Sequence, residues 1–246
     1  MSQAGWVNSA PINGKAERLD KNILYFSLPG IFTIMHNTFT KDNFHEICLQ
    51  LAKKDKALKA IMDTYGLPPM WTRPAIFQTL ILTILEQQVS LASAYAAFKK
   101  LKKKIGFVTP RKILLLTDAE LRACYFSRQK IIYARALATA VVSKKINLKK
   151  LRQSTDEEIR IVLKQIKGIG DWTVDVYLMH ALQRSDLFPL GDIALVNSLK
   201  EVKQLHPKAG KEEMLAIAEN WRPYRTVASM MLWHAYIQKK GIKVYG

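Results

Sequence analysis

The chain has 246 residues, of which 49% are hydrophobic and 24% are charged, and this composition excludes a disordered or collagen-like protein. Lys and Arg number 38 against 20 Asp and Glu, so the formal net charge is +18, which favours a polyanionic partner. Cys48 and Cys124 are too few for a disulfide framework, a four-thiolate zinc site or an iron–sulfur cluster. The sequence therefore predicts a globular protein of a reducing compartment.

The first forty residues differ in character from the rest. Residues 1–20 are rich in Ser, Asn, Gly and Pro and are interpreted as a tail or a segment lying over the fold. Residues 22–40 lack Lys, Arg, Asp and Glu, but polar residues and Pro29-Gly30 interrupt the apolar run, so we exclude a membrane span. Charged residues before this run exclude a secretory signal, and a cytoplasmic, nucleoid-associated or nuclear location is expected.

The remaining pattern is helical almost throughout. Ser90 and Gly106 are expected to begin and end one helix, and two capping boxes, Thr117 with Glu120 and Ser154 with Glu157, predict further helix starts. Strand signals are confined to residues 23–35, where Pro29-Gly30 could turn a short hairpin. We therefore predict an all-α fold with a short N-terminal β-ribbon. One helix face is formed by residues at the spacing i, i+3, i+4, i+7 and i+8: Phe77, Leu80, Ile81, Ile84 and Leu85.

Two glycines separate a pair of predicted helices at residues 167–170. Backbone N–H groups at the start of the second helix lack intrahelical acceptors and lie at the positive end of the helix dipole, so they can bind a phosphate. Lys164, Lys167 and Thr173 are near enough in sequence to add contacts. The alternative is an ordinary helical hairpin with a glycine cap, and the basic charge of the chain favours the phosphate-binding interpretation.

Asp192 follows Pro189-Leu190-Gly191 and precedes an apolar helical stretch, so it is predicted to be a helix N-cap. A purely capping role is one interpretation. The other uses the same geometry: N–H donors and the helix dipole stabilise the ionised carboxylate, and an anion held there can oppose a developing oxocarbenium ion.

Four segments and one further tryptophan carry a resemblance to a known family. Residues 163–173, with Lys167-Gly168-Ile169-Gly170, and residues 188–192 resemble the helix-hairpin-helix and Gly/Pro-Asp signature of base-excision DNA glycosylases. Residues 84–90 resemble the segment that this superfamily places at the minor groove, and residues 221–225 with Trp233 resemble the C-terminal helices of its alkylpurine branch. Within the superfamily the chain is most similar to the 3-methyladenine DNA glycosylase II type.

The resemblance implies roles for single residues. Asp192 matches the catalytic aspartate, Trp172 and Trp233 match walls of the base pocket, and Gln88 matches the wedge that fills the gap left by a flipped nucleotide. Lysine-dependent lyases of the family carry their nucleophile where this chain has Trp172, so the resemblance implies a monofunctional enzyme. The implied DNA contacts come from the hairpin: Lys167, Gly168, Ile169, Gly170 and Thr173.

The implied partner is damaged double-stranded DNA, bound by a monomer. A monovalent cation at the hairpin carbonyls is also implied, whereas the five histidines show no paired metal-ligand spacing and predict no metal bound by side chains. The expected domains are residues 1–40, an appended segment, and 41–246, the glycosylase domain. Its central lobe would span about 73–185, and its second lobe about 41–72 with 186–246.

The expected activity is hydrolytic removal of alkylated purines of the 3-methyladenine and 7-methylguanine type. The main alternative is a non-catalytic helix-hairpin-helix adaptor, which would bind DNA with the same salt dependence and be indifferent to loss of the Asp192 charge. An RNA-binding protein is a third possibility, without an aromatic RNA-stacking motif to favour it.

Overall fold

The computed structural model describes residues 16–20, 23–28, 31–36 and 38–244 and divides the chain into two compact units, residues 1–37 and 38–246. The expected domain boundary after residue 40 lies close to this division, and the two predicted lobes stay a prediction. Among the described residues, no helix is long and apolar enough to span a bilayer.

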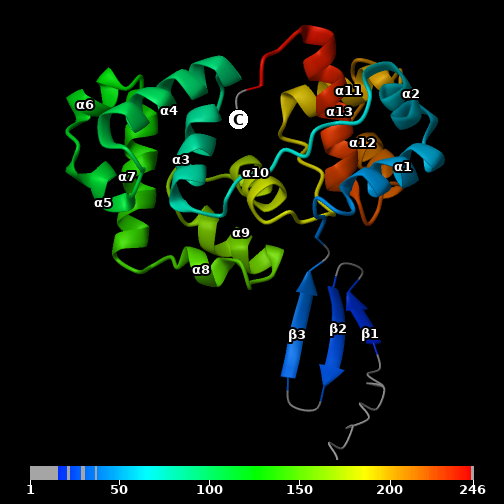
Figure 1. Ribbon diagram of the computed structural model, residues 1–246, viewed down its shortest axis with the longest axis horizontal. Helices are drawn as coiled ribbons and strands as arrows, with labels where there is room; N and C mark the ends of the chain where they lie inside the picture. The colour runs from blue at the N-terminus through cyan, green and yellow to red at the C-terminus, as the bar shows by residue number, and fades with distance from the viewer. Residues whose placement is uncertain (1–15, 21–22, 29–30, 37, 245–246) are drawn as a thin grey trace, which may run out of the picture. The chain divides into compact units, whose positions relative to one another are not determined.

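The first unit contains a small antiparallel sheet with the strand order β1-β2-β3 (Figure 1). Its strands are β1 (Ala16–Asp20), β2 (Ile23–Leu28) and β3 (Ile31–His36). In the register of β2 with β3, Leu28 lies opposite Ile31, as in the predicted hairpin, whereas the turn at Pro29-Gly30 lies outside the described residues. The interpretation of residues 1–20 as a tail is wrong for β1, because pairing with β2 gives its backbone groups partners.

The second unit is helical, as predicted. Its helices are α1 (Phe44–Lys54), α2 (Lys56–Tyr65), α3 (Phe77–Glu86), α4 (Leu91–Ile105), α5 (Pro110–Leu115), α6 (Asp118–Ala123), α7 (Arg128–Val142), α8 (Leu148–Leu151), α9 (Asp156–Lys164), α10 (Asp171–Ala181), α11 (Ile193–Val202), α12 (Lys211–Glu219) and α13 (Arg225–Lys240).

These helices pack in two groups around buried apolar helices. Helix α3 contacts α4, α7 and α10, and α13 contacts α1, α2 and α11 (Figure 1). Leu80, Ile81 and Ile84 of α3 are completely buried, which confirms the apolar face predicted for this helix. Helix α13 is buried through most of its length, from Thr226 to Ala235, because neighbours cover it on several sides.

Capping residues set most helix starts where the sequence placed them. Ser90 accepts the backbone N–H of Ser93 at the start of α4, and the box of Thr117 with Glu120 opens α6. The second predicted box is wrong by one residue. Thr155 and Glu158 form the reciprocal pair at the start of α9, so the neighbouring Ser154 and Glu157 are not its members.

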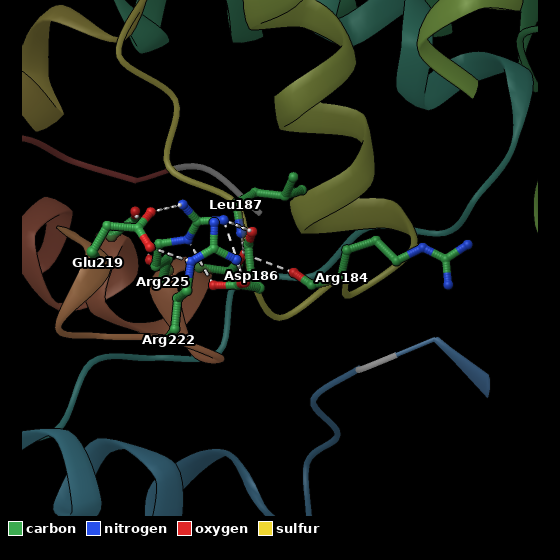
Figure 2. Close-up of polar contacts among 8 residues, drawn as sticks. Arg184, Asp186, Leu187, Glu219, Arg222 and Arg225 are labelled. Atoms are coloured by element: carbon green, nitrogen blue, oxygen red, sulfur yellow. Dashed lines mark hydrogen bonds and ion pairs between the residues drawn. The ribbon is translucent and has the colours of Figure 1, made fainter. Parts of the chain in front are cut away.

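A buried carboxylate ties the loop after α10 to the start of α13 (Figure 2). Asp186 accepts from Arg222 Nη1 at 2.7 Å and from Arg225 Nε at 2.7 Å, and Glu219 pairs with both arginines at 2.6 and 3.1 Å. The Asp186 side chain is only 5% exposed, so these bonds replace the hydrogen bonds to water that its charge loses on burial. The same loop continues to Asp192, and the network therefore positions that residue's segment.

Asp186→Asn is expected to lower the free energy of unfolding by about 2 kcal/mol, because a neutral amide gives up charge-assisted bonds while Arg222 and Arg225 keep their charges. Urea unfolding followed by circular dichroism measures this change. The control is Asp63→Asn, which removes the charge of an exposed helical ion pair with Lys59 and should cost less than about 0.5 kcal/mol. Equal stabilities of the two variants would contradict a central role for the network.

Candidate active site

A cleft of about 2390 Å³ crosses the second unit. It is lined by the turn between α3 and α4, the hairpin before α10, the start of α11 and the C-terminal half of α13. This volume exceeds that of ordinary small-molecule pockets, about 300 to 1,000 Å³, and suits a macromolecular ligand. The predicted site residues on its surface are Gln88, Gly168, Ile169, Gly170, Trp172, Thr173, Asp192 and Trp233.

Asp192 is the N-cap of α11, as predicted, and its carboxylate is surrounded by N–H donors. Its Oδ1 accepts from the backbone N–H of Leu195 at 2.9 Å and from Trp233 Nε1 at 3.0 Å. Its Oδ2 accepts from Trp172 Nε1 at 2.9 Å. Three donors from three helices therefore stabilise the negative charge and hold the carboxylate in one orientation at the cleft.

The two predicted tryptophans contact this carboxylate through their indole edges. Trp172 is half-buried in the first turn of α10, and Trp233 is 8% exposed within α13. The Trp233 ring is stacked on His180, with centroids 5.4 Å apart and an interplanar angle of 25°. The structure therefore brings Trp172, Trp233 and Asp192 together, and it adds His180 as an aromatic neighbour on the same wall.

The predicted hairpin connects α9 to α10. Gly168 has a φ of +89°, and a Cβ at this position would lie 2.0 Å from the Tyr133 ring, so only glycine fits. Lys167 and Gly170 are exposed, whereas Ile169 is 4% exposed and packs inside. The buried Ile169 anchors the turn in the core. The N–H groups at the start of α10 stay at the cleft surface.

Adjacent glutamines after α3 have different positions. Gln87 Nε2 donates to the Gly168 carbonyl at 2.8 Å and to Thr173 Oγ1 at 2.9 Å, so it fastens the end of α3 to the hairpin. Thr173 is 1% exposed, which makes its side chain part of this internal bond. Gln88 is exposed on the cleft and has a left-handed φ of +55°, which is uncommon for a residue other than glycine.

Comparison with known proteins covers most of this arrangement, and Trp233 lies beyond the matched span. Residues 81–223 match the family described as "HhH-GPD superfamily base excision DNA repair protein", a span that includes the α3–α4 turn, the hairpin and Asp192. The chain belongs to the HhH-GPD superfamily. DNA-3-methyladenine glycosylase 1 of Schizosaccharomyces pombe is 33% identical over 161 residues, which are 64% of this chain and 71% of that protein.

Other relatives agree with this assignment to the HhH-GPD superfamily. The YfjP protein of Bacillus subtilis is 32% identical over 187 residues, or 73% of this chain, and the match spans just under two thirds (65%) of YfjP. The solved structure of Schizosaccharomyces pombe 3-methyladenine DNA glycosylase (Mag1) in complex with abasic DNA is 29% identical, with a TM-score of 0.71. That superposition covers 76% of this chain and 95% of Mag1.

Three charged residues of this HhH-GPD site were not among the predicted site residues. Arg73 and Glu86 form a bidentate ion pair at 2.6 and 2.7 Å on the cleft wall, and the Glu86 side chain is only 9% exposed. Lys130 Nζ donates to the Leu85 carbonyl at 2.6 Å, and burial lowers the pKa of Lys130. Glu86 lies within the segment 84–90 that carries the resemblance. Arg73 and Lys130 lie outside this segment in sequence, and only the tertiary structure brings them into contact with it.

The lysine run of α4 divides between the cleft and local contacts. Lys99, Lys102 and Lys103 line the cleft, so they place positive charge where a polyanion would lie. Lys104 instead pairs with Glu120 at 2.9 Å, and Lys100 lies 3.8 Å above the Tyr125 ring. The helical periodicity of α4 alone does not separate the lysines that line the cleft from those in local contacts, because Glu120 and Tyr125 lie outside α4.

His180 occupies the last turn of α10 and is held neutral. Its Nδ1 lies 2.8 Å from the Trp71 carbonyl. Burial, with the nearby charge of Arg73, lowers the pKa of His180 from its ordinary 6.5 to about 4, against smaller opposing effects of the Trp71 bond and Asp192. The side chain is therefore uncharged near neutral pH.

This burial predicts a pH dependence of stability. Between pH 6.5 and 4 the unfolded chain binds a proton at residue 180 that the folded chain does not, so stability falls as the pH is lowered through this window. From pH 7 to pH 5 this group should cost the wild type about 2 kcal/mol. Urea unfolding of wild type and His180→Gln at pH 7 and pH 5 isolates the contribution of His180, because the contributions of other titrating groups cancel when the two proteins are compared. An equal loss in both proteins would contradict it.

Among the residues that the structure describes, no three His, Cys, Asp or Glu side chains cluster as a metal site would require. The cysteines Cys48 and Cys124 are both buried and unpaired, and burial raises the pKa of Cys48 to about 12. Neither thiol is therefore placed for nucleophilic chemistry at the cleft.

Proposed function

We propose that this chain is a monofunctional DNA glycosylase of base excision repair, which flips alkylated purines of the 3-methyladenine and 7-methylguanine type out of duplex DNA and hydrolyses their N-glycosidic bond. The observation that carries the proposal is the Asp192 carboxylate, anchored by Trp172 and Trp233 in a cleft beside the hairpin. The similarity to proteins named as 3-methyladenine DNA glycosylases supports this substrate class.

In the proposed reaction, an N-alkylated purine already carries positive charge, so its glycosidic bond is weak and needs little protonation by the enzyme. Asp192 would stabilise the positive charge that develops on the sugar and would orient or deprotonate the attacking water. The proposed pocket walls, Trp172 and Trp233, would bind the electron-poor base by cation–π attraction, worth about 1 to 2 kcal/mol for each contact when desolvated.

The proposed DNA contacts follow from the same cleft. N–H groups at the start of α10 would bind a phosphate, with Lys167 exposed beside them, and Lys99, Lys102 and Lys103 would add sequence-independent attraction. Gln88 would enter the base stack and offset part of the cost of flipping, a few kcal/mol. The exposed position of Gln88 supports this role.

A monovalent cation at the hairpin remains part of the proposal. Carbonyl oxygens of residues 167–170 would hold it, since oxygen donors suit hard cations, and the Gly168 carbonyl has a second lone pair besides the one that accepts from Gln87. Such an ion would supply positive charge near a bound phosphate. We also propose that the protein acts where its DNA is, in the nucleoid-containing cytoplasm or the nucleus.

The proposal is tested by incubating the purified protein with dimethyl sulfate-treated duplex DNA and measuring released bases by mass spectrometry. Release of 3-methyladenine or 7-methylguanine is expected, and binding without release would instead establish the adaptor. Borohydride trapping on the same DNA should give no covalent adduct, because no lysine stands at position 172. A trapped adduct would contradict the monofunctional reaction.

A further inference from the structure

One polar atom on the wall of the candidate pocket has no role in the proposed chemistry. His180 lies on the same face of α10 as Trp172 and Val176, at the spacing i, i+4, i+8, and all three line the cleft. Its ring is stacked on Trp233, whose indole donates to Asp192. His180, Trp233 and Asp192 thus line the same cleft, in which the flipped base is proposed to bind.

The hydrogen bond at Trp71 decides which ring nitrogen of His180 carries the proton. A carbonyl oxygen only accepts, so Nδ1, 2.8 Å from the Trp71 oxygen, must be the donor. The ring is neutral, and Nε2 therefore keeps a lone pair. Among the hydrogen bonds of the described residues none uses Nε2, and the ring borders the cleft.

We propose that His180 is a specificity-determining residue whose Nε2 accepts an N–H of the amino group at C6 of a flipped adenine-type base, so that the site prefers 3-methyladenine to 7-methylguanine, which has a carbonyl oxygen at C6. This inference rests on the proposed function. A fixed acceptor strengthens the binding of a base that presents a donor. It weakens the binding of a base that lacks one, because the lone pair of Nε2 is then left without a partner. Stacking on Trp233 and the bond to Trp71 keep the ring from rotating to present a donor instead.

The test compares two stable duplexes that differ in one amino group. One contains 3-deaza-3-methyladenine, and the other contains the same ring system without its amino group. Wild type should bind the amino-bearing duplex about 10-fold more tightly. His180→Phe keeps an aromatic ring on Trp233 but loses the acceptor, and it should bind the two duplexes equally. His180→Gln, which retains an acceptor oxygen, should recover part of the preference.

Two controls separate recognition from folding. A duplex with an abasic site has no base to contact His180, so wild type and His180→Phe should bind it within about twofold of each other. A structural defect would weaken binding of all three duplexes alike, whereas loss of the acceptor abolishes only the amino preference. Excision of 3-methyladenine by His180→Phe should fall by about 10- to 100-fold.

The inference is overturned if wild type shows no amino preference, if His180→Phe keeps the wild-type preference, or if its losses are equal on all duplexes. Failure of the proposed function has another signature. In that case wild type itself releases no alkylated base from methylated DNA, whatever the binding preference of the two proteins.

Discussion

Asp192→Asn is expected to lower the rate of alkylpurine release by about 100- to 1,000-fold. The substitution removes the negative charge that would oppose the oxocarbenium ion. It also replaces one acceptor oxygen by an NH₂ group, although Oδ1 and Oδ2 both accept indole N–H groups in the structure. Single-turnover release of 3-methyladenine and 7-methylguanine from methylated duplex DNA measures the effect.

Two measurements show whether Asp192→Asn acts on chemistry. Affinity for an abasic-site duplex should remain within about threefold of wild type, because the hairpin and the lysines of α4 are untouched. Asp63→Asn removes the same charge from an exposed ion pair and should leave the release rate unchanged. Wild-type rates in Asp192→Asn would remove the proposed mechanism and favour the adaptor.

Gly168→Ala is expected to destabilise the protein by about 3 kcal/mol and to weaken its binding to duplex DNA. The backbone φ of +89° costs an L-residue about 1 to 2 kcal/mol, and a Cβ 2.0 Å from the Tyr133 ring must push that ring or the turn aside for a similar amount. Urea unfolding measures the first loss, and fluorescence anisotropy with a labelled duplex measures the second.

The matched control lies two residues away in the same turn. Gly170 has an ordinary φ of −105° and no atom within 4 Å of a Cβ, so Gly170→Ala should cost no more than about 1 kcal/mol. Adding Tyr133→Ala to Gly168→Ala removes the ring that meets the new methyl group but leaves the backbone strain. Equal stabilities of the two glycine variants would show that the turn tolerates a side chain at position 168.

Local features of the site could be predicted because their cause is local. The N-cap role of Asp192, the hairpin at 167–170 and the start of α4 at Ser90 depend on residues only a few positions apart. The error at α9 has the same origin, since Ser154 and Thr155 are adjacent capping residues, each followed three positions later by a glutamate, and the helix begins after Thr155.

The two indole partners of Asp192 could not be predicted from local sequence, unlike the capped N–H of Leu195 three residues on. Its three donors come from α10, α11 and α13, and the two indoles lie 20 and 41 residues away along the chain. The same holds for Gln87, which reaches a hairpin 81 residues further on, and for the pairing of Arg73 with Glu86. Such contacts depend on the packing of α3, α10 and α13.

By itself the sequence determined a basic, helical protein with a glycine hairpin and a capping aspartate, because charge, periodicity and capping act over a few residues. Only the tertiary structure decided which tryptophan edges hold the carboxylate, which lysines reach the cleft, and that His180 is neutral with one nitrogen lacking a partner among the described residues. Burial and distance set these properties, and both arise when helices distant in sequence pack together.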